Sequence, residues 1–380
     1  MSTIKDLLSG FNTDLQNGLK YNLNKGKKLV GCVYPVYCPE ELVTAAGMVP
    51  IGLMGSETRL SEAGNYFPPF MCSIVQSICE DGIQGRLKDL SMLMTPTVCD
   101  HLRALHQNFI AAVPGIPVEA IALPLNREVG GAVTFLEKRH KKLAAKLGEI
   151  AGITITDDMV REAIEVHNEH RAAMRDFVAV AKAYPHLISA TDRNRVIVSQ
   201  NYYDKAEHAA MVRELVAACW KEDKSSWTGK KIILSGVTGS LNRFVEILDE
   251  NNVAVVWDDM LEGSHQFLRD VSLATGDPYR ALANHFIGSE PSCLLYNPKK
   301  ERGIILGGIA KDHAADGVID IQITFCEPED FDWPTMLKDL KLAQVPAIKL
   351  EMDLQGANYG KIETALQTFL DTLSESSVTA

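Results

Sequence analysis

The stretch KLVGCVYPVYCPEELVTAAGMVPIGLMG, residues 28–55, decides the fold class of this chain. Residues 28–37 are apolar and contain β-branched side chains, as is typical of a buried strand. Residues 40–48 have helical spacing, and residues 49–55 indicate a second strand. A strand, a helix and another strand in this order predict the start of a mostly parallel sheet with helices on both faces.

The same alternation continues on both sides of a long helical region. LSMLMTP (90–96) and VEAIALPLN (118–126) indicate two more strands in the first third of the chain. From about Gly130 to Lys221 the spacing is helical almost throughout, and Thr156 with the two acidic residues after it indicates the start of the longest helix. Four further strands are then expected at KKIILSGVT (230–238), VAVVWDDM (253–260), VIDIQITF (318–325) and VPAIKLEMD (345–353).

The pattern predicts an α/β protein with two doubly wound, mostly parallel-sheet lobes joined by a helical connector. With 380 residues, the chain exceeds what one hydrophobic core usually fills. We expect an N-terminal α/β lobe at residues 1–129, the connector at 130–228 and a C-terminal α/β lobe at 229–380. Gly229 in SWTGKK marks the second boundary.

The composition excludes several classes of function. A net charge of −11 argues against nucleic-acid binding, because no basic stripe is present to replace the counterions around phosphates. No apolar run reaches the roughly 18 residues that a membrane span needs, and the N-terminal sequence has no signal-peptide pattern. We therefore expect a cytoplasmic protein with no membrane partner. In such a chain, the 8 cysteines are expected to be reduced thiols or metal ligands, not disulfides.

Three cysteines stand where the chain leaves apolar segments: Cys72, Cys99 and Cys326. Cys99 and Cys326 follow predicted strands, so their thiols should emerge at the carboxyl ends of a sheet. Each of the three also precedes a predicted helix, whose N-terminal dipole favours a thiolate. Soft thiolates are the ligands of iron-sulfur clusters, and three of them leave one iron without a cysteine. The alternative is that each thiol is a small buried apolar group, as free cysteines commonly are.

Other candidate residues carry weaker signals. SGVTGS (235–240) has neither the spacing nor the lysine of a phosphate-binding loop, so a tight turn is expected there. Asp258 and Asp259 end a strand and either face a site or form a turn. His101 and His106 are five residues apart, which does not match the spacing of a metal-binding pair on a helix. Cys79 lies on the same predicted helix as Cys72, with a core role expected, and the remaining cysteines are expected to be packing residues, namely Cys32, Cys38, Cys219 and Cys293.

Several segments together resemble the 2-hydroxyacyl-CoA dehydratase family, specifically the β subunits, or D-components, of (R)-2-hydroxyacyl-CoA dehydratases. Benzoyl-CoA reductase subunits are more distant relatives. The resemblance extends over nearly the whole chain. It is carried by residues 26–55, FPPFMCSIVQS (67–77), PTVCDHL (96–102), IEVHNEHRAAMRDFV (164–178), LYNPKKERG (295–303) and FCEPEDFDWP (325–334).

The resemblance implies a 4Fe-4S cluster held by Cys72, Cys99 and Cys326, with a fourth ligand that is not cysteine. It implies a redox enzyme that removes water from an (R)-2-hydroxyacyl-CoA through a ketyl radical, giving a 2-enoyl-CoA. A homologous α subunit would bind most of the acyl-CoA, and a separate ATP-dependent iron-sulfur activator protein would supply the electron. The sequence leaves open which acyl group is used and whether a flavin is also bound.

Two alternatives remain open at this point. Some reductase-like branches of the family carry a further cysteine after the strand that matches KKIILSG, where this chain has Val237, Thr238 and Gly239. This difference favours a dehydratase subunit over an ATP-driven benzoyl-CoA-reductase-like or double-cubane reductase. The second alternative, from another class, is a non-redox two-lobed ligand-binding protein.

Overall fold

The computed structural model describes residues 3–238, 242–356 and 358–376. Within them lie two four-stranded sheets in which every neighbouring pair of strands is parallel. The first has the order β2-β1-β3-β4 and the second the order β6-β5-β7-β8, so both lobes have the same topology. The first-sheet strands are β1 (Leu29–Val33), β2 (Val49–Leu53), β3 (Leu90–Pro96) and β4 (Val118–Ile121). The second-sheet strands are β5 (Lys230–Gly236), β6 (Val253–Met260), β7 (Gly317–Ile323) and β8 (Ala347–Met352).

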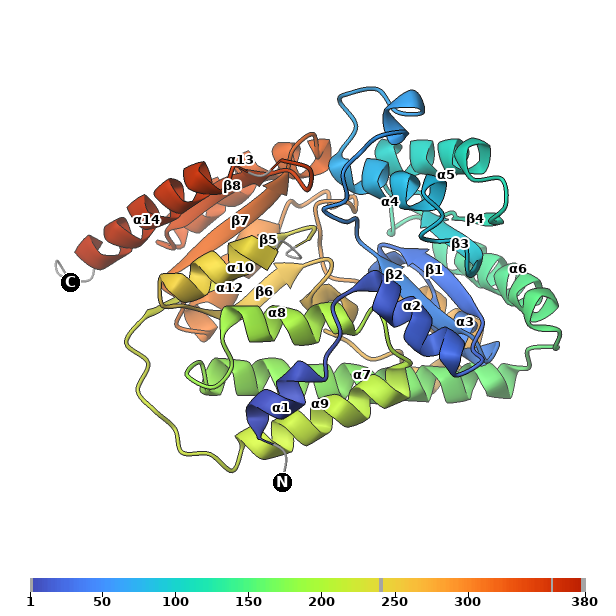
Figure 1. The fold of residues 1–380 in the computed structure, drawn as a ribbon, viewed down its shortest axis with the longest axis horizontal. Helices are drawn as coiled ribbons and strands as arrows, with labels where there is room; N and C mark the ends of the chain where they lie inside the picture. Colours follow the sequence, from blue (N-terminus) through green and yellow to red (C-terminus); the bar gives the residue numbers. More distant parts are fainter. Residues whose placement is uncertain (1–2, 239–241, 357, 377–380) are drawn as a thin grey trace.

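Both sheets are covered by helices on both faces, which confirms the predicted fold class (Figure 1). On the first sheet, α3 (Glu40–Ala45) and α6 (Ala132–Ala151) pack on one face, and α4 (Ser73–Ile83) and α5 (Asp100–Ala112) on the other. On the second sheet, α10 (Asn242–Glu250) and α14 (Tyr359–Ser376) lie opposite α12 (Arg302–Asp312) and α13 (Glu327–Leu342). The strands are nearly continuous apolar runs because both of their faces are buried.

The connector contains α7 (Asp157–Ala183), α8 (Ala190–Ser199) and α9 (Lys205–Cys219), which run beneath both sheets in Figure 1. As predicted, Thr156 is the N-cap of α7, and its side chain accepts a hydrogen bond from the N–H of Met159 at 3.3 Å. α7 contacts α3 of the first lobe and β6 of the second. The connector therefore holds the two lobes against a common support.

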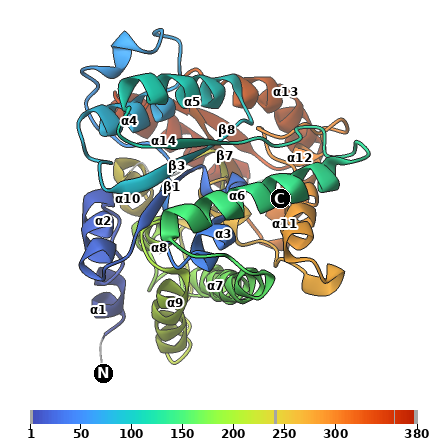
Figure 2. The same ribbon diagram turned by 90° about the vertical axis from the view of Figure 1, so that its right-hand side faces the viewer.

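The remaining elements complete the packing around the two sheets. Near the N-terminus, α1 (Ile4–Ser9) packs on α9, and α2 (Leu15–Asn24) contacts β1. α11 (Pro278–Ile287) follows the second sheet's edge strand in sequence but packs against α6, as Figure 2 shows. Short 3-10 turns are η1 (Pro35–Tyr37), η2 (Ala63–Asn65), η3 (Ser264–Gln266) and η4 (Leu273–Thr275). No helix in the described part of the chain has the length and apolar character needed to cross a membrane.

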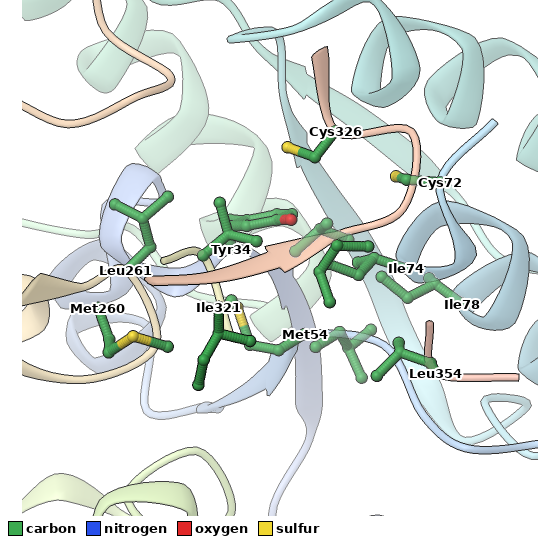
Figure 3. Packing of buried hydrophobic residues seen from close by; sticks show 14 of the residues in the cluster. Tyr34, Met54, Cys72, Ile74, Ile78, Met260, Leu261, Ile321, Cys326 and Leu354 are labelled. Atoms are coloured by element: carbon green, nitrogen blue, oxygen red, sulfur yellow. The ribbon is translucent and has the colours of Figure 1, made fainter. Parts of the chain in front are cut away.

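The two lobes also meet directly through buried apolar side chains. Met54, Ile74 and Ile78 of the first lobe belong to the same core cluster as Leu354 and Ile321 of the second (Figure 3). At this contact the N–H of Leu354 donates a hydrogen bond to Ser73 Oγ at 3.2 Å. The start of α4 is thus fixed relative to the end of β8.

Candidate metal centre

The candidate site lies where the strand order of each sheet reverses. In both sheets the connections leave the two central strands in opposite directions, β1 and β3 in the first and β5 and β7 in the second. Ligands of open α/β sheets bind at such switch points, beyond the carboxyl ends of the strands. Cys99 follows β3 and Cys326 follows β7. Cys72 joins them from the start of α4, on the segment that follows β2.

All three cysteines are N-cap residues, as the sequence predicts. Cys72 caps α4, Cys99 caps α5 and Cys326 caps α13. Cys99 Sγ accepts the N–H of Leu102 at 3.5 Å. The N–H of Cys72 donates to His101 Nδ1 at 3.2 Å, which links the starts of α4 and α5. His101 is therefore a satisfied histidine, as expected, and it fixes the relative position of two of the thiols.

The thiols are close enough to act on one another electrostatically. After burial, a negative charge on Cys99 is among the causes that raise the pKa of Cys72, and a charge on Cys72 is among those that raise the pKa of Cys326. All three cysteines are among the causes that raise the pKa of Tyr34, and in Figure 3 the hydroxyl end of Tyr34 lies toward Cys72 and Cys326. The fold thus brings together three residues that are widely separated in sequence. Their role as cluster ligands stays a prediction.

The geometry of the thiols distinguishes a cluster from a single ion. Among the described residues, no three His, Cys, Asp or Glu side chains gather closely enough to hold one metal ion. A four-iron cluster presents separate iron corners, so its thiols need only surround it and do not need to converge on one point. A set of three soft donors that lie close enough to influence one another is therefore compatible with a cluster.

The protonation of the thiols supports the same fit. Burial raises the pKa of Cys72 to about 12, and it also raises the pKa values of Cys99 and Cys326. Backbone N–H groups at the helix starts lower these values, but burial outweighs them. The helix dipole alone therefore does not produce thiolates here. A coordinated metal cation would, because it lowers the pKa of a bound thiol far more strongly.

Glu329, one helical turn after Cys326, ties the two central strands of the second sheet together. Its Oε1 accepts the N–H of Val237 at 3.0 Å, and its Oε2 accepts the N–H of Ile323 at 3.2 Å. The side chain is buried, and burial together with the nearby Asp320 raises its pKa to about 8. Glu329 thus holds the loop that carries Cys326 against the loop that follows β5. Gly239 of that second loop lies outside the described residues.

A buried arginine organises the strand ends on the other side of Glu329. The Arg302 guanidinium donates to Asp259 Oδ2 at 2.8 Å, to Ser235 Oγ at 2.8 Å and to Asp332 Oδ2 at 3.0 Å. These partners belong to β6, β5 and α13. Of the two aspartates that end β6, Asp259 is therefore an ion-pair partner. Asp258 is a turn former, since its Oδ1 accepts the N–H of Ser264 at 2.7 Å, and it pairs with Arg193 as well.

The other cysteines differ in their distance from this site. Cys79 is fully buried in the core under α4, and Cys32, Cys38 and Cys219 are also buried. Cys293 is closer than the sequence indicates, because its charge is one of the causes that raise the pKa of Cys326. His106 is a satisfied histidine, hydrogen-bonded to Thr95 Oγ1 at 2.9 Å.

Sequence reasoning missed Tyr34, Glu329 and Arg302 as residues of this region. Glu329 had one usable signal, namely its position one turn after a cysteine at a helix start. Arg302 lies in the segment LYNPKKERG, which contributes to the family resemblance but contains no chemical motif. Tyr34 had no signal, because only the fold shows that a residue following β1 reaches thiols from three other elements.

Two doubly wound lobes with thiols at the switch points of both sheets define a class of two-lobed α/β proteins with a shared site between the lobes. Within that class, the chain belongs to the family described as 2-hydroxyglutaryl-CoA dehydratase, D-component, whose model matches residues 35–373.

Three relatives illustrate the range of this family. The "(R)-phenyllactyl-CoA dehydratase beta subunit" of Clostridium sporogenes is 38% identical and covers 98% of this chain and 100% of its own length. The "(R)-2-hydroxyglutaryl-CoA dehydratase, subunit beta" of Acidaminococcus fermentans is 33% identical, over 92% of this chain and 93% of its own. A benzoyl-CoA reductase subunit of Thauera aromatica is 27% identical, over 89% of each chain.

Proposed function

We propose that this chain is the β subunit of a cytoplasmic (R)-2-hydroxyacyl-CoA dehydratase, a hydro-lyase, and that Cys72, Cys99 and Cys326 hold a 4Fe-4S cluster in it. The observation that carries the proposal is the gathering of three N-cap thiols from both lobes around Tyr34. Two dehydratase β subunits among the relatives align with it over nearly their whole length.

The proposed reaction converts an (R)-2-hydroxyacyl-CoA into a 2-enoyl-CoA and water. The β-hydrogen is barely acidic and the hydroxyl group is a poor leaving group, so direct elimination is slow. One electron added to the thioester carbonyl gives a ketyl radical anion, which expels hydroxide. The β-proton then becomes acidic and is lost, and the electron returns, so no net oxidation or reduction occurs. When bound, the cluster supplies and recovers this electron.

The residues of this chain would provide the environment for that transfer. Cys72 and Cys99 enter from the first lobe and Cys326 from the second, so the site exists only when the lobes are in contact. Glu329 fixes the Cys326 loop through two backbone N–H groups. Cys72 and Cys326 are buried and Cys99 is half-buried, so the fold shields the sulfur atoms from much of the water, and burial and hydrogen bonding are the main influences on cluster potential.

The proposal requires partners. A homologous α subunit would complete a heterodimer and bind most of the acyl-CoA. An ATP-dependent iron-sulfur activator protein would deliver the first electron. The relatives act on phenyllactyl and 2-hydroxyglutaryl thioesters, so the acyl group of this enzyme has to be found with a panel that contains both aromatic and charged acids.

The benzoyl-CoA reductase relative motivates a second candidate, an ATP-driven reductase subunit. The two candidates differ in their electron balance. A dehydratase needs electrons only in catalytic amounts, whereas a reductase consumes them in proportion to product. Counting product molecules per electron supplied separates them.

Anaerobic iron and sulfide analysis of this chain, purified with its neighbouring α subunit, tests the proposal. We expect about four irons per chain, consistent with one 4Fe-4S cluster, and broad charge-transfer absorption. Cys99→Ser and Cys326→Ser should lose this iron while keeping the far-ultraviolet circular dichroism of the folded chain. Cys219→Ser, remote from the site, and Cys293→Ser, beside it, should keep the iron. Flavin content is measured on the same samples.

A full cluster in Cys99→Ser would refute the ligand set. A colourless, folded and iron-free wild-type protein, even after anaerobic reconstitution, would favour a non-redox binding protein instead.

A further inference from the structure

Tyr34 has an unusual backbone conformation at the carboxyl end of β1. Its φ of 48° and ψ of 75° lie in the left-handed region. For a residue with a Cβ this conformation costs about 1–2 kcal/mol, and such outliers gather at functional sites. The conformation is held at both ends, because the Tyr34 N–H donates to Leu53 O at 3.2 Å and the Tyr34 carbonyl accepts the N–H of Tyr37 at 2.9 Å. The chain therefore leaves the strand in a fixed direction.

The side chain of Tyr34 points toward two of the three thiols. In Figure 3 its hydroxyl end lies on the side of the sulfur atoms of Cys72 and Cys326. Of the charged groups that affect it, Cys72 comes first, then Cys326 and Cys99. These three cysteines are the N-caps of α4, α13 and α5, so thiols from three separate elements affect the phenol.

The hydroxyl group of Tyr34 has no hydrogen-bond partner among the residues that the structure describes, although the side chain is only 4% exposed. The hydroxyl oxygen is not among the fully buried atoms that lack a partner, so it keeps a small accessible surface, whereas the hydroxyl groups of buried tyrosines usually have a hydrogen-bond partner. A strained residue thus presents an unused donor on the side where Cys72 and Cys326 lie.

We propose that the Tyr34 hydroxyl group donates a hydrogen bond to a sulfur atom of the iron-sulfur cluster and thereby raises its reduction potential. This inference rests on the proposed function, because it requires that the three thiols hold a cluster. The donor favours the reduced cluster, since that state carries one more negative charge and accepts a stronger hydrogen bond. Tyr34 is thus a potential-setting residue, and it contributes no bond to iron.

The chain offers a matched control three residues away. Tyr37 lies in the same turn and is 3% exposed, but its hydroxyl group is already hydrogen-bonded to Ser292 Oγ at 2.8 Å. Of the four cysteines in this region, only Cys293 is among the main groups that affect it. Removing the Tyr37 hydroxyl should therefore leave the cluster unaffected, whereas removing the Tyr34 hydroxyl should not.

The test compares Tyr34→Phe and Tyr37→Phe with wild type in the anaerobically purified heterodimer. Iron content is measured first, and then the midpoint potential of the cluster in this chain by a redox titration followed with electron paramagnetic resonance. We expect full iron in both variants and a lower midpoint in Tyr34→Phe only. A tenfold change in the ratio of oxidised to reduced cluster corresponds to about 59 mV for a one-electron couple, and we expect a shift of this order.

The outcomes separate the two proposals. Unchanged potential in Tyr34→Phe with full iron overturns the role of Tyr34 and leaves the proposed function intact. Absence of iron from the wild-type chain overturns both. If Tyr34→Phe does not fold, the wild-type cluster decides: iron–sulfur stretching frequencies that are the same in H₂O and D₂O overturn the hydrogen bond, and a shift supports it.

Discussion

Replacing Arg302 with methionine should destabilise the C-terminal lobe by several kcal/mol. The Arg302 side chain is 7% exposed and joins Asp259, Ser235 and Asp332. Methionine keeps much of the side-chain length but removes the Arg302 charge from two carboxylates, leaving His265 beside Asp259 at 2.6 Å and Lys300 beside Asp332 at 3.8 Å. Removing one partner of a buried ion pair costs about 3–5 kcal/mol. Asp320 adds to this cost, because burial already raises its pKa to about 6 and Arg302 is the first group that lowers it.

Urea unfolding followed by circular dichroism measures this loss. With a denaturant slope of about 3 kcal/mol per molar urea, the expected loss lowers the midpoint by about 1–1.7 M. The matched control is Arg243→Met. Arg243 also pairs with three acidic residues, Glu246, Glu250 and Glu363, but its side chain is 38% exposed.

Water screens exposed ion pairs, so Arg243→Met should hardly move the midpoint. An equal shift in the two variants would refute the reasoning that burial, and not the number of ion pairs, sets the contribution of Arg302. A shift of less than about 0.3 M in Arg302→Met, or under 1 kcal/mol, would refute the assigned magnitude.

Two further outcomes are expected. Burial lowers the pKa of His140 to about 4 and the pKa values of His167 and His208 to about 3. In the unfolded chain these histidines have the ordinary pKa of about 6.5. Below that pH the unfolded chain therefore binds more protons than the folded chain. The contribution of these histidines is therefore full above that pH and falls as the pH drops towards the folded values. Between pH 7.5 and 5.5 the three histidines lower the free energy of unfolding by about 4 kcal/mol, and the raised pKa values of Glu329 and Asp320 offset part of this loss. Urea curves that do not depend on pH would contradict the net decrease. Gly236→Ala should lower the unfolding temperature of the second lobe, because the added Cβ would lie 2.3 Å from the Ile321 carbonyl oxygen. The control is Gly26→Ala, at a position with a positive φ but open space around it. This control should cost only the conformational strain of about 1–2 kcal/mol. Equal thermal shifts in the two glycine variants would contradict the close approach of β5 and β7.

The strands and the helix starts were predictable because their signals are local. Seven of the eight described strands lie within the predicted segments and β7 begins one residue earlier, at Gly317, while Cys72, Cys99 and Cys326 cap helices as expected. These features depend on apolar runs and on residue types at the ends of those runs, which a single sequence displays. The three proposed cluster ligands could be chosen only through the family resemblance, because the spacing of cysteines in the sequence does not show which thiols lie close together.

The rest of the site could not be predicted because it depends on contacts between distant segments. Tyr34 reaches cysteines of three other helices, and Arg302 connects β5, β6 and α13. The balance between burial and the helix dipole at the thiols was also hidden, because burial is a property of the whole fold. Local sequence patterns predicted that each cysteine lies at the start of a helix, but they did not predict whether its sulfur is protonated.

The hydrogen bond from Leu354 N–H to Ser73 Oγ puts the junction of the lobes one residue away from Cys72. A movement that opens this junction also carries Cys72 away from Cys326. Any occupant shared by the two residues would act as a reversible cross-link, stabilising the closed chain by mass action. Thermodynamic reciprocity then makes the affinity for the occupant depend on how readily the lobes close. Substitutions at the junction, far from any sulfur atom, would change retention of the occupant, and loss of the occupant would appear as faster amide exchange at Leu354.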